Sequence, residues 1–231
     1  ELDHFVRIKP KYEPLSFVTF KELGKFGRVG NQMFQIANLI SLAHTHNDIV
    51  KINWYCNYTN KDMSQFFKHK IPNSNVNALK VSYTYNEPQY NYNEIPYMKG
   101  MNLHGYFQSE KYFAQCKEMV KYYFEPSDQV LNKLQSKYSS ILNSNTCSIH
   151  IRRGDYVNNK THEVCNIDYY KKAIEKISSM EKIDNFVVFS DDIAWCQQNF
   201  PNTYTFVNDN LDIEDLFLMS LCKHNIIANS S

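Results

Sequence analysis

The residues with the clearest chemical potential form one run, SIHIRRGDY, at positions 148–156. The run places an imidazole (His150), two guanidinium groups (Arg152 and Arg153) and a carboxylate (Asp155) at the end of an alternating pattern typical of a buried strand. Adjacent arginines in a crevice require an anion against them, and their planar fork fits the oxygens of a phosphate or diphosphate. The run therefore predicts a diphosphate ligand. The competing interpretation is a surface turn in which Arg and Asp pair with each other.

Two other expected strands end in polar residues, FSDD at 189–192 and ANSS at 228–231. Asp191 and Asp192 are able to accept hydrogen bonds from a purine or a ribose hydroxyl, to bind a metal ion, or to cap the next helix. For Ser190 we expect helix capping. Ser230 and Ser231 place hydroxyl groups where a phosphate would accept from them. Because ligands of open α/β sheets bind at the carboxyl ends of strands, the three ends together predict a nucleoside diphosphate site.

A glycine-containing turn, GRVGNQM at 27–33, lies between an expected strand and an expected helix. Backbone N–H groups of Gly27, Gly30 and Asn31 would face an anion at such a helix start. The turn lacks the third glycine of the dinucleotide fingerprint and the Gly-Lys-Ser/Thr of a P-loop. A tight turn that only needs positive φ at glycine is an equal alternative.

A further run, HGYFQSEKYF at 104–113, combines aromatic rings with amide and charged groups. Sugar-binding clefts often have this composition, but aromatic core packing beside a helix cap is the alternative.

The elements that would position these residues fall into two regions. The first has expected strands at 15–20 and 49–54 around a helix at 31–46, which makes one βαβ unit, and a helical apolar spacing at 109–124. Between 76 and 97, Asn, Tyr and Pro crowd without periodicity, so we expect a long surface loop. The residues at 125–128 mark the boundary between the regions.

The second region alternates strands with helices, which predicts a parallel sheet covered by helices. Its expected strands end near 151 and span 186–190, 204–207 and 224–228; its expected helices span 167–180 and 212–222. No covering helix follows the strand at 224–228 in this sequence. We therefore expect an exposed apolar sheet face and an incomplete second domain.

Composition indicates a globular protein without a general attraction to polyanions. The chain has 231 residues, 43% of them hydrophobic, and a net charge of +1 without long like-charged blocks. Nothing predicts binding to nucleic acid, and no apolar run is long enough to span a bilayer. The six cysteines are scattered without zinc-site spacing, which predicts no metal site and favours free thiols in a reducing compartment. A cytoplasmic or membrane-peripheral location would fit, and the sequence does not predict an oligomeric state.

Five motifs taken together resemble the ordered motifs of the α-1,2-fucosyltransferases, glycosyltransferase family 11. They lie at 27–37, 105–113, 149–157, 167–173 and 218–231. The resemblance implies a GT-B-like pair of Rossmann-like domains, with an acceptor side at 1–125 and a GDP-sugar side at 126–231. It also implies GDP-β-L-fucose as donor, a galactose-terminated glycan as acceptor, and inversion without an obligatory metal ion. Family chains continue past Asn-Ser-Ser, and Arg28 and Val29 stand where the family commonly has Gly-Leu.

The resemblance also implies a role for each motif residue. Arg152 would bind the β-phosphate as the catalytic residue, while His150 and Asp155 would organise the nucleotide pocket. Arg153 would support Arg152 or pair with Asp155. Two further roles are implied: guanine or ribose recognition by Asp191 or Asp192, and phosphate binding by Ser230 and Ser231. Apart from the resemblance, the residue types leave His104, Glu110 and Glu163 as alternatives for the base that takes the proton of the acceptor hydroxyl.

Three functions remain open from the sequence. They are an inverting fucosyltransferase or a transferase of another GDP-linked deoxysugar, a non-catalytic nucleotide-sugar or glycan-binding protein, and a structural α/β domain. Five motifs in family order argue against the third.

Overall fold

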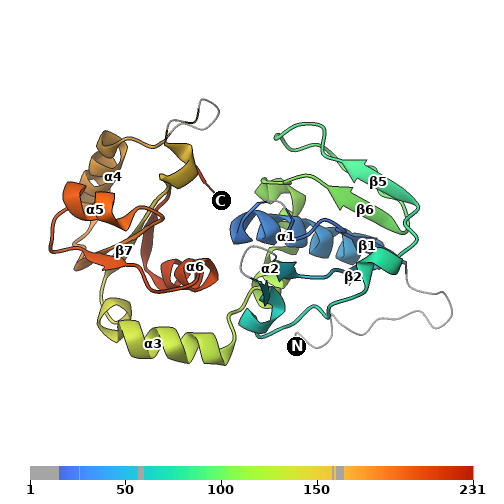
Figure 1. The fold of residues 1–231 in the computed structure, drawn as a ribbon, viewed down its shortest axis with the longest axis horizontal. Coiled ribbons are helices and arrows are strands. Elements are labelled where there is room, and N and C mark those ends of the chain that lie inside the picture. Colours follow the sequence, from blue (N-terminus) through green and yellow to red (C-terminus); the bar gives the residue numbers. More distant parts are fainter. Residues whose placement is uncertain (1–15, 26, 57–59, 158, 160–163, 231) are drawn as a thin grey trace. The chain divides into compact units, whose positions relative to one another are not determined.

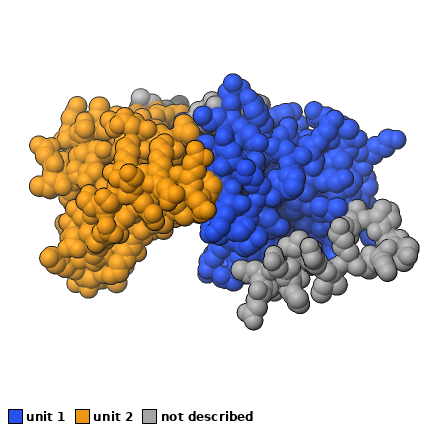
Figure 2. All heavy atoms as spheres, turned by 90° about the horizontal axis from the view of Figure 1, so that it is seen from below, with its two compact units in different colours: residues 1–125 blue, residues 126–231 orange. Residues whose placement is uncertain are grey.

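The computed structural model describes residues 16–25, 27–56, 60–157, 159 and 164–230. The chain divides into two compact units, residues 1–125 and 126–231 (Figure 2). Leu15, Glu163 and Ser231, which the sequence analysis singled out, lie outside the described residues. The acceptor and nucleotide roles expected for the two regions stay predictions.

The first unit is built on a parallel sheet with the strand order β2-β1-β6-β5. Helix α1 (Val29–His46) connects β1 to β2 and buries Ile36, Leu39 and Ile40, whose spacing places them on one helical face. It ends at Asn47, which adopts the left-handed conformation with φ 56°. This confirms the expected βαβ unit. The strands are β1 (Phe17–Thr19), β2 (Ile49–Lys51), β5 (Tyr83–Asn86) and β6 (Met101–His104).

Short elements complete the first unit. Strands β3 and β4 form a two-stranded antiparallel sheet, and the described residues of this unit also form α2 and the 3-10 turns η2, η3, η4 and η5. Their bounds are β3 (Tyr55–Cys56), β4 (Lys61–Asp62), η2 (Met63–Phe66), η3 (Val76–Ala78), η4 (Glu110–Tyr112), η5 (Ala114–Cys116) and α2 (Lys117–Tyr123).

Two expectations for this unit are wrong. The segment 76–97 is not a loop throughout, because it contains η3 and the edge strand β5, which pairs with β6. Its regularity comes from hydrogen bonds to a distant strand rather than from local periodicity. The segment 109–124 is not one helix: it forms η4, η5 and α2 in succession.

The second unit holds a parallel sheet with the strand order β10-β7-β8-β9, as the alternation of strands and helices predicted. Helices α4 and α5 lie on one side of this sheet, and α3 and α6 lie on the other (Figure 1). The bounds are α3 (Asp128–Leu142), β7 (Thr146–Ile151), η6 (Gly154–Tyr156), α4 (Ile167–Met180), β8 (Asn185–Ser190), α5 (Ile193–Asn199), β9 (Thr205–Val207), α6 (Asp212–Leu221) and β10 (His224–Ile226).

Strand β7 organises the core of the second unit because it lies between β10 and β8. Cys147, Ile149 and Ile151 point to one face and pack in a buried cluster with Tyr170 of α4. Side chains alternate along a strand, so His150 points to the opposite face. The apolar positions of β7 therefore fix which way the functional side chains of the same strand point.

The expected exposed face of the last strand is largely buried. Ile226 and Ala228 are 7% and 6% exposed, and Ile226 belongs to the cluster that includes Tyr170. Ile227 is 64% exposed, and its carbonyl oxygen accepts a hydrogen bond of 2.7 Å from the Tyr169 hydroxyl of α4. Helix α4 thus covers the face of Ile226 and Ala228, whereas Ile227 on the opposite face is exposed as expected.

Asp215 on α6 carries a charge that destabilises the second unit. Burial, together with the neighbouring acids Asp212 and Glu214, raises the pKa of Asp215 from 3.8 to about 6. Asn210 Nδ2 donates to Asp215 Oδ1 at 3.0 Å, which offsets part of this rise. Because the folded state holds this proton more tightly, the free energy of unfolding falls as pH rises from 3.8 to about 6, and the penalty is constant above that.

We expect Asp215→Asn to remove this penalty while keeping an oxygen for Asn210. The free energy of unfolding should rise by on the order of 2 kcal/mol near pH 7.5 and hardly change near pH 4. Denaturant melts at both pH values measure the effect, with the exposed Asp209→Asn as control. Equal stabilisation at both pH values would contradict the assignment.

Candidate active site

Arg152 lies directly after β7 and is held by carboxylates on two sides. Its side chain is 9% exposed, its Nη1 lies 2.8 Å from Asp191 Oδ2, and its Nη2 donates to Asp155 Oδ1. The Cζ atom also lies 5.2 Å from the ring centroid of Tyr156. Arg152 Nε is buried and has no hydrogen-bond partner among the described residues. The guanidinium is thus fixed in orientation, and its Nε–H group is still without an acceptor among the described residues.

Arg153 uses a different set of contacts. Its backbone N–H donates to Asp191 Oδ1 at 2.9 Å, and its Nε donates to Asp192 Oδ2 at 3.0 Å. The guanidinium lies over the indole of Trp195, with Cζ 3.9 Å from the ring centroid. Of the two alternatives for Arg153, pairing with Asp155 is therefore wrong, since Asp155 contacts Arg152.

Gly154 allows this turn to close on the neighbouring strand end. A Cβ atom at Gly154 would overlap Asp191 Oδ2. Any side chain here would push Asp191 away from Arg152 and from the Arg153 backbone. The glycine of the motif is thus explained by close approach rather than by positive φ.

Asp192, not Ser190, caps helix α5. Asp192 Oδ1 accepts from the Trp195 backbone N–H at 3.2 Å, and Ser190 Oγ accepts from the Asp192 backbone N–H at 3.0 Å. Our expectation for Ser190 is therefore wrong. Asp192 is committed to the helix start and to Arg153, whereas Asp191 joins the ends of β7 and β8. A direct contact of either aspartate with guanine or ribose stays a prediction.

His150 precedes the two arginines on β7 and is partly buried. Burial lowers its pKa, the Asp191 and Asp212 carboxylates act in the opposite direction, and Arg152 adds to the lowering. The imidazole is therefore neutral at neutral pH. It then has one donor and one acceptor nitrogen to offer a ligand.

The charges of the cluster restrict which anion it accepts. Two guanidinium groups and three carboxylates leave a net charge of −1 while His150 is neutral. A diphosphate must therefore replace a carboxylate at the guanidinium instead of adding to it. Asp155 is the weakest partner of Arg152, because its side chain is 66% exposed, whereas that of Asp191 is 19% exposed.

The third strand end lies beside the first, since β10 pairs with β7 in parallel register. Ser230 follows β10 at the carboxyl edge of the sheet and is partly buried. The second unit thus brings Ser230 to the same edge as the arginine and aspartate residues. The expected glycine-loop residues Gly27, Gly30 and Asn31 belong to the first unit.

The glycine loop leads into α1 without a side-chain cap. Gly27 has φ 77°, and a Cβ atom there would lie 2.5 Å from Asn31 Cβ, so this position requires glycine. Gln32 Nε2 donates to the Gly27 carbonyl oxygen at 3.2 Å, and Gln32 Oε1 accepts from Trp54 Nε1 at 2.9 Å. The first turn of α1 has no acidic residue, which leaves its positive end open to an anion.

The expected base residues His104 and Glu110 have different surroundings. His104 ends β6, is exposed and lines a cavity in the first unit, whereas Glu110 is an exposed residue of η4. Sequence reasoning missed Glu87, which lines the same cavity and whose Oε2 accepts from the backbone N–H groups of Tyr106 and Phe107. Glu87 stands in an aperiodic segment, so no local pattern marks it.

Residues 14–231 match the family described as Glycosyl transferase family 11. The chain belongs to this family. This confirms the family that the five motifs predicted from the sequence.

Three curated relatives illustrate the range of the family. O-antigen biosynthesis glycosyltransferase WbnK of Escherichia coli is 39% identical over 145 residues, covering 57% of this chain and 48% of its own. Alpha-1,2-colitosyltransferase of Escherichia coli is 33% identical, covering 89% and 82%. Galactoside alpha-(1,2)-fucosyltransferase 1 of Rattus norvegicus is 25% identical, covering 87% and 58%. The chain thus spans about half the length of the first and third of these relatives.

The fold is that of solved GT-B fucosyltransferases. Fucosyltransferase NodZ from Bradyrhizobium is 12% identical with a TM-score of 0.57, covering 90% of this chain and 84% of its own. NodZ alpha-1,6-fucosyltransferase soaked with GDP-fucose is 13% identical with a TM-score of 0.55, covering 90% and 82%. With the two parallel sheets, this confirms the expected pair of Rossmann-like domains.

No described helix is both long and apolar enough to cross a membrane. Among the described residues, no group of three or more His, Cys, Asp or Glu side chains is placed to hold a metal ion.

We expect Arg152→Ala to lower the rate of sugar transfer by a factor of about 100 or more, about 3 kcal/mol of transition-state binding. Arg152→Lys should rescue poorly, because an ammonium group cannot make two directed contacts at once. Initial rates of transfer measure both variants, and melting temperatures show whether Asp191, left unpaired, unfolds the unit. Lys223→Ala, a change in a surface ion pair with Glu181, is the control. A folded Arg152→Ala protein with normal turnover would remove Arg152 from the active site.

Proposed function

We propose that this protein transfers L-fucose from GDP-β-L-fucose to the 2-hydroxyl of a galactose-containing glycan, with inversion at the anomeric carbon. Membership of family 11 and the α-1,2 specificities of the colitosyltransferase and the fucosyltransferase among its relatives support the linkage. The observation that carries the proposal is the oriented guanidinium of Arg152, held between Asp191 and the exposed Asp155 at the end of β7.

In the proposed reaction, the acceptor oxygen bonds to the anomeric carbon as the bond from that carbon to the β-phosphate oxygen breaks. Negative charge then grows on the departing GDP. Arg152 exchanges Asp155 for the β-phosphate and keeps Asp191, so the guanidinium stays aligned while it neutralises this charge. Neutral His150, Ser230 and Ser231 donate hydrogen bonds to phosphate oxygens. A metal ion is not required, because the guanidinium supplies the compensating charge.

Other contacts of the donor in the second unit are proposed by the same logic. Asp191 or Asp192 accepts from guanine or ribose, and Arg153, whose guanidinium lies over the indole of Trp195, supports the turn. The start of α1 at Gly27, Gly30 and Asn31 is a separate proposed anion site of the first unit. The acceptor hydroxyl loses its proton to a base. Of the described candidates we favour His104, since it lines a cavity and Glu110 does not.

A second donor is supported by a specific observation. One relative, an alpha-1,2-colitosyltransferase, covers 89% of this chain and 82% of its own. Colitose is L-fucose without the 3-hydroxyl, so the donors differ by one group. A site with polar partners for that hydroxyl discriminates by about 10⁴ or more, whereas an apolar site discriminates by roughly 10² or less.

Transfer assays distinguish fucose, colitose and the non-catalytic alternative. We expect GDP release from GDP-fucose to depend on lactose as a galactose-terminated acceptor and to be unchanged by EDTA. The ratio of kcat/KM for GDP-fucose and GDP-colitose assigns the sugar. No acceptor-dependent release from either donor would leave only a binding function, and loss of activity with EDTA would overturn metal independence.

Nucleotide recognition is tested separately from catalysis. GDP should raise the melting temperature by an amount that keeps growing with the GDP concentration, whereas UDP and CMP at the same concentration should not raise it, because carboxylates suit the N–H donors of guanine. The gain should shrink in Arg152→Ala and persist in Lys223→Ala. Equal shifts with all three nucleotides would argue against guanine recognition.

A further inference from the structure

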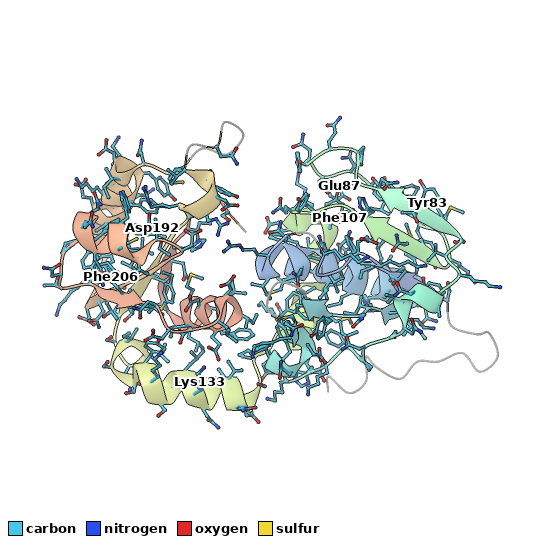
Figure 3. All side chains as sticks on the ribbon, in the orientation of Figure 1. Tyr83, Glu87, Phe107, Lys133, Asp192 and Phe206 are labelled. Carbon is cyan, nitrogen blue, oxygen red and sulfur yellow. The ribbon has the colours of Figure 1, made fainter. Side chains whose placement is uncertain are left out.

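A cavity in the first unit lies where β5 and β6 end. Its volume is about 490 Å³, within the roughly 300–1,000 Å³ typical of small-molecule sites. Glu87 and Phe107 come together there from the two strand ends (Figure 3). The residues that shape its chemistry are Glu87, Gln89, Tyr90, His104, Gly105 and Tyr106.

The floor of the cavity is held rigidly. Glu87 Oε2 accepts from the Tyr106 and Phe107 backbone N–H groups at 2.7 and 2.9 Å. Gly105 has φ 153°, and a Cβ atom there would overlap Glu87. Gln35 Nε2 of α1 also donates to the Gly105 carbonyl oxygen at 3.0 Å. The backbone after β6 is therefore fixed before any ligand arrives.

Two acceptor oxygens beside this floor lack a donor. Glu87 Oε1 and Gln35 Oε1 are buried and have no hydrogen-bond partner among the described residues. Gln35 itself is fully buried. Buried acceptors without donors are rare and costly, and here both belong to side chains that hold the same loop. Neither buried oxygen is within reach of a ligand in the cavity; the polar side chains of its lining that are exposed are those of Gln89 and His104.

The wall of the cavity is aromatic and open to solvent. Tyr90 is 77% exposed, and its ring centroid lies 6.1 Å from that of Tyr106. The segment that carries Tyr90 is anchored further along, where the Asn93 backbone N–H donates to the Tyr112 hydroxyl at 3.1 Å. A large exposed ring on an anchored segment offers a flat apolar face at low entropic cost.

The charge of the cavity excludes the nucleotide as its occupant. None of its described lining residues is Lys or Arg, and Glu87 contributes a carboxylate. A diphosphate would be repelled here. A neutral pyranose matches on every point, since its C–H face packs on tyrosine rings and its hydroxyl groups donate to amide and imidazole acceptors.

We infer that this cavity binds the terminal galactose of the glycan acceptor, with Tyr90 and Tyr106 against the sugar ring and Gln89 and His104 around its hydroxyl groups. The inference rests on the proposed function, because it assigns the acceptor side of that reaction. It also gives His104 a place next to a sugar hydroxyl.

Tyr90→Ala tests the inference by kinetics. The KM for lactose should rise at least tenfold, while the KM for the GDP-sugar donor stays within twofold. Tyr90→Phe should behave like the wild type, since the ring face remains. Tyr83→Ala is the matched control, because Tyr83 is an exposed tyrosine of β5, 39% exposed, that does not line the cavity. Unchanged lactose KM in Tyr90→Ala would overturn the inference.

Saturation-transfer NMR of lactose with the full chain gives a readout that needs no turnover. A signal that Tyr90→Ala abolishes and Tyr83→Ala keeps supports the cavity even if no sugar is transferred, in which case only the proposed function fails. Transfer to lactose that Tyr90→Ala leaves intact means that the function stands and the cavity assignment fails. Absence of any lactose signal with the wild-type chain also overturns the assignment.

Discussion

The ion pair between Arg152 and Asp191 is the interaction on which the nucleotide side depends. It joins the residue after β7 to the residue after β8, with 2.8 Å between Nη1 and Oδ2. The second oxygen of Asp191 accepts from the Arg153 backbone N–H, and Gly154 leaves room for that carboxylate. One carboxylate thus sets both the direction of a guanidinium and the path of the chain around it. A pair so poorly exposed gains little net stability from its charges, so its value lies in orientation.

Orientation has a consequence for binding. The carboxylates that hold the two arginines also leave the cluster with more negative than positive charge. Under the proposed function an anion would displace Asp155, because the side chain of Asp155 is 66% exposed. Asp191 and Asp192 are tied to the arginines through backbone or helix-cap contacts as well. We therefore expect Asp191 and Asp192 to stay with the arginines and align them, and Asp155 to give up its place to a phosphate.

Much of the second unit follows from its sequence, and less of the first does. Strands β7 and β8 and helices α4 and α6 have strong periodic patterns, and parallel pairing then brings residues 150–155 and 191–192 to one edge. The sequence did not predict which carboxylate meets which arginine, because this depends on angstrom-scale placement of two separate turns. In the first unit, β5 is ordered by hydrogen bonds to β6 and so escapes any local pattern. Glu87 was missed for the same reason, since its partners are nineteen and twenty residues away.

The two units apply one construction to two kinds of ligand chemistry. In each, parallel strands end at one edge, and a carboxylate there fixes the loop that follows a neighbouring strand: Asp191 binds the turn after β7, and Glu87 binds the turn after β6. What differs is the side chain presented beside that carboxylate. Guanidinium groups beside Asp191 suit an anionic diphosphate, whereas tyrosine rings beside Glu87 suit a neutral sugar. Under the proposed function, the charged donor and the uncharged acceptor must each be kept from the other's site. Guanidinium groups are present at one site and absent from the described lining of the other, and this difference would provide the selectivity.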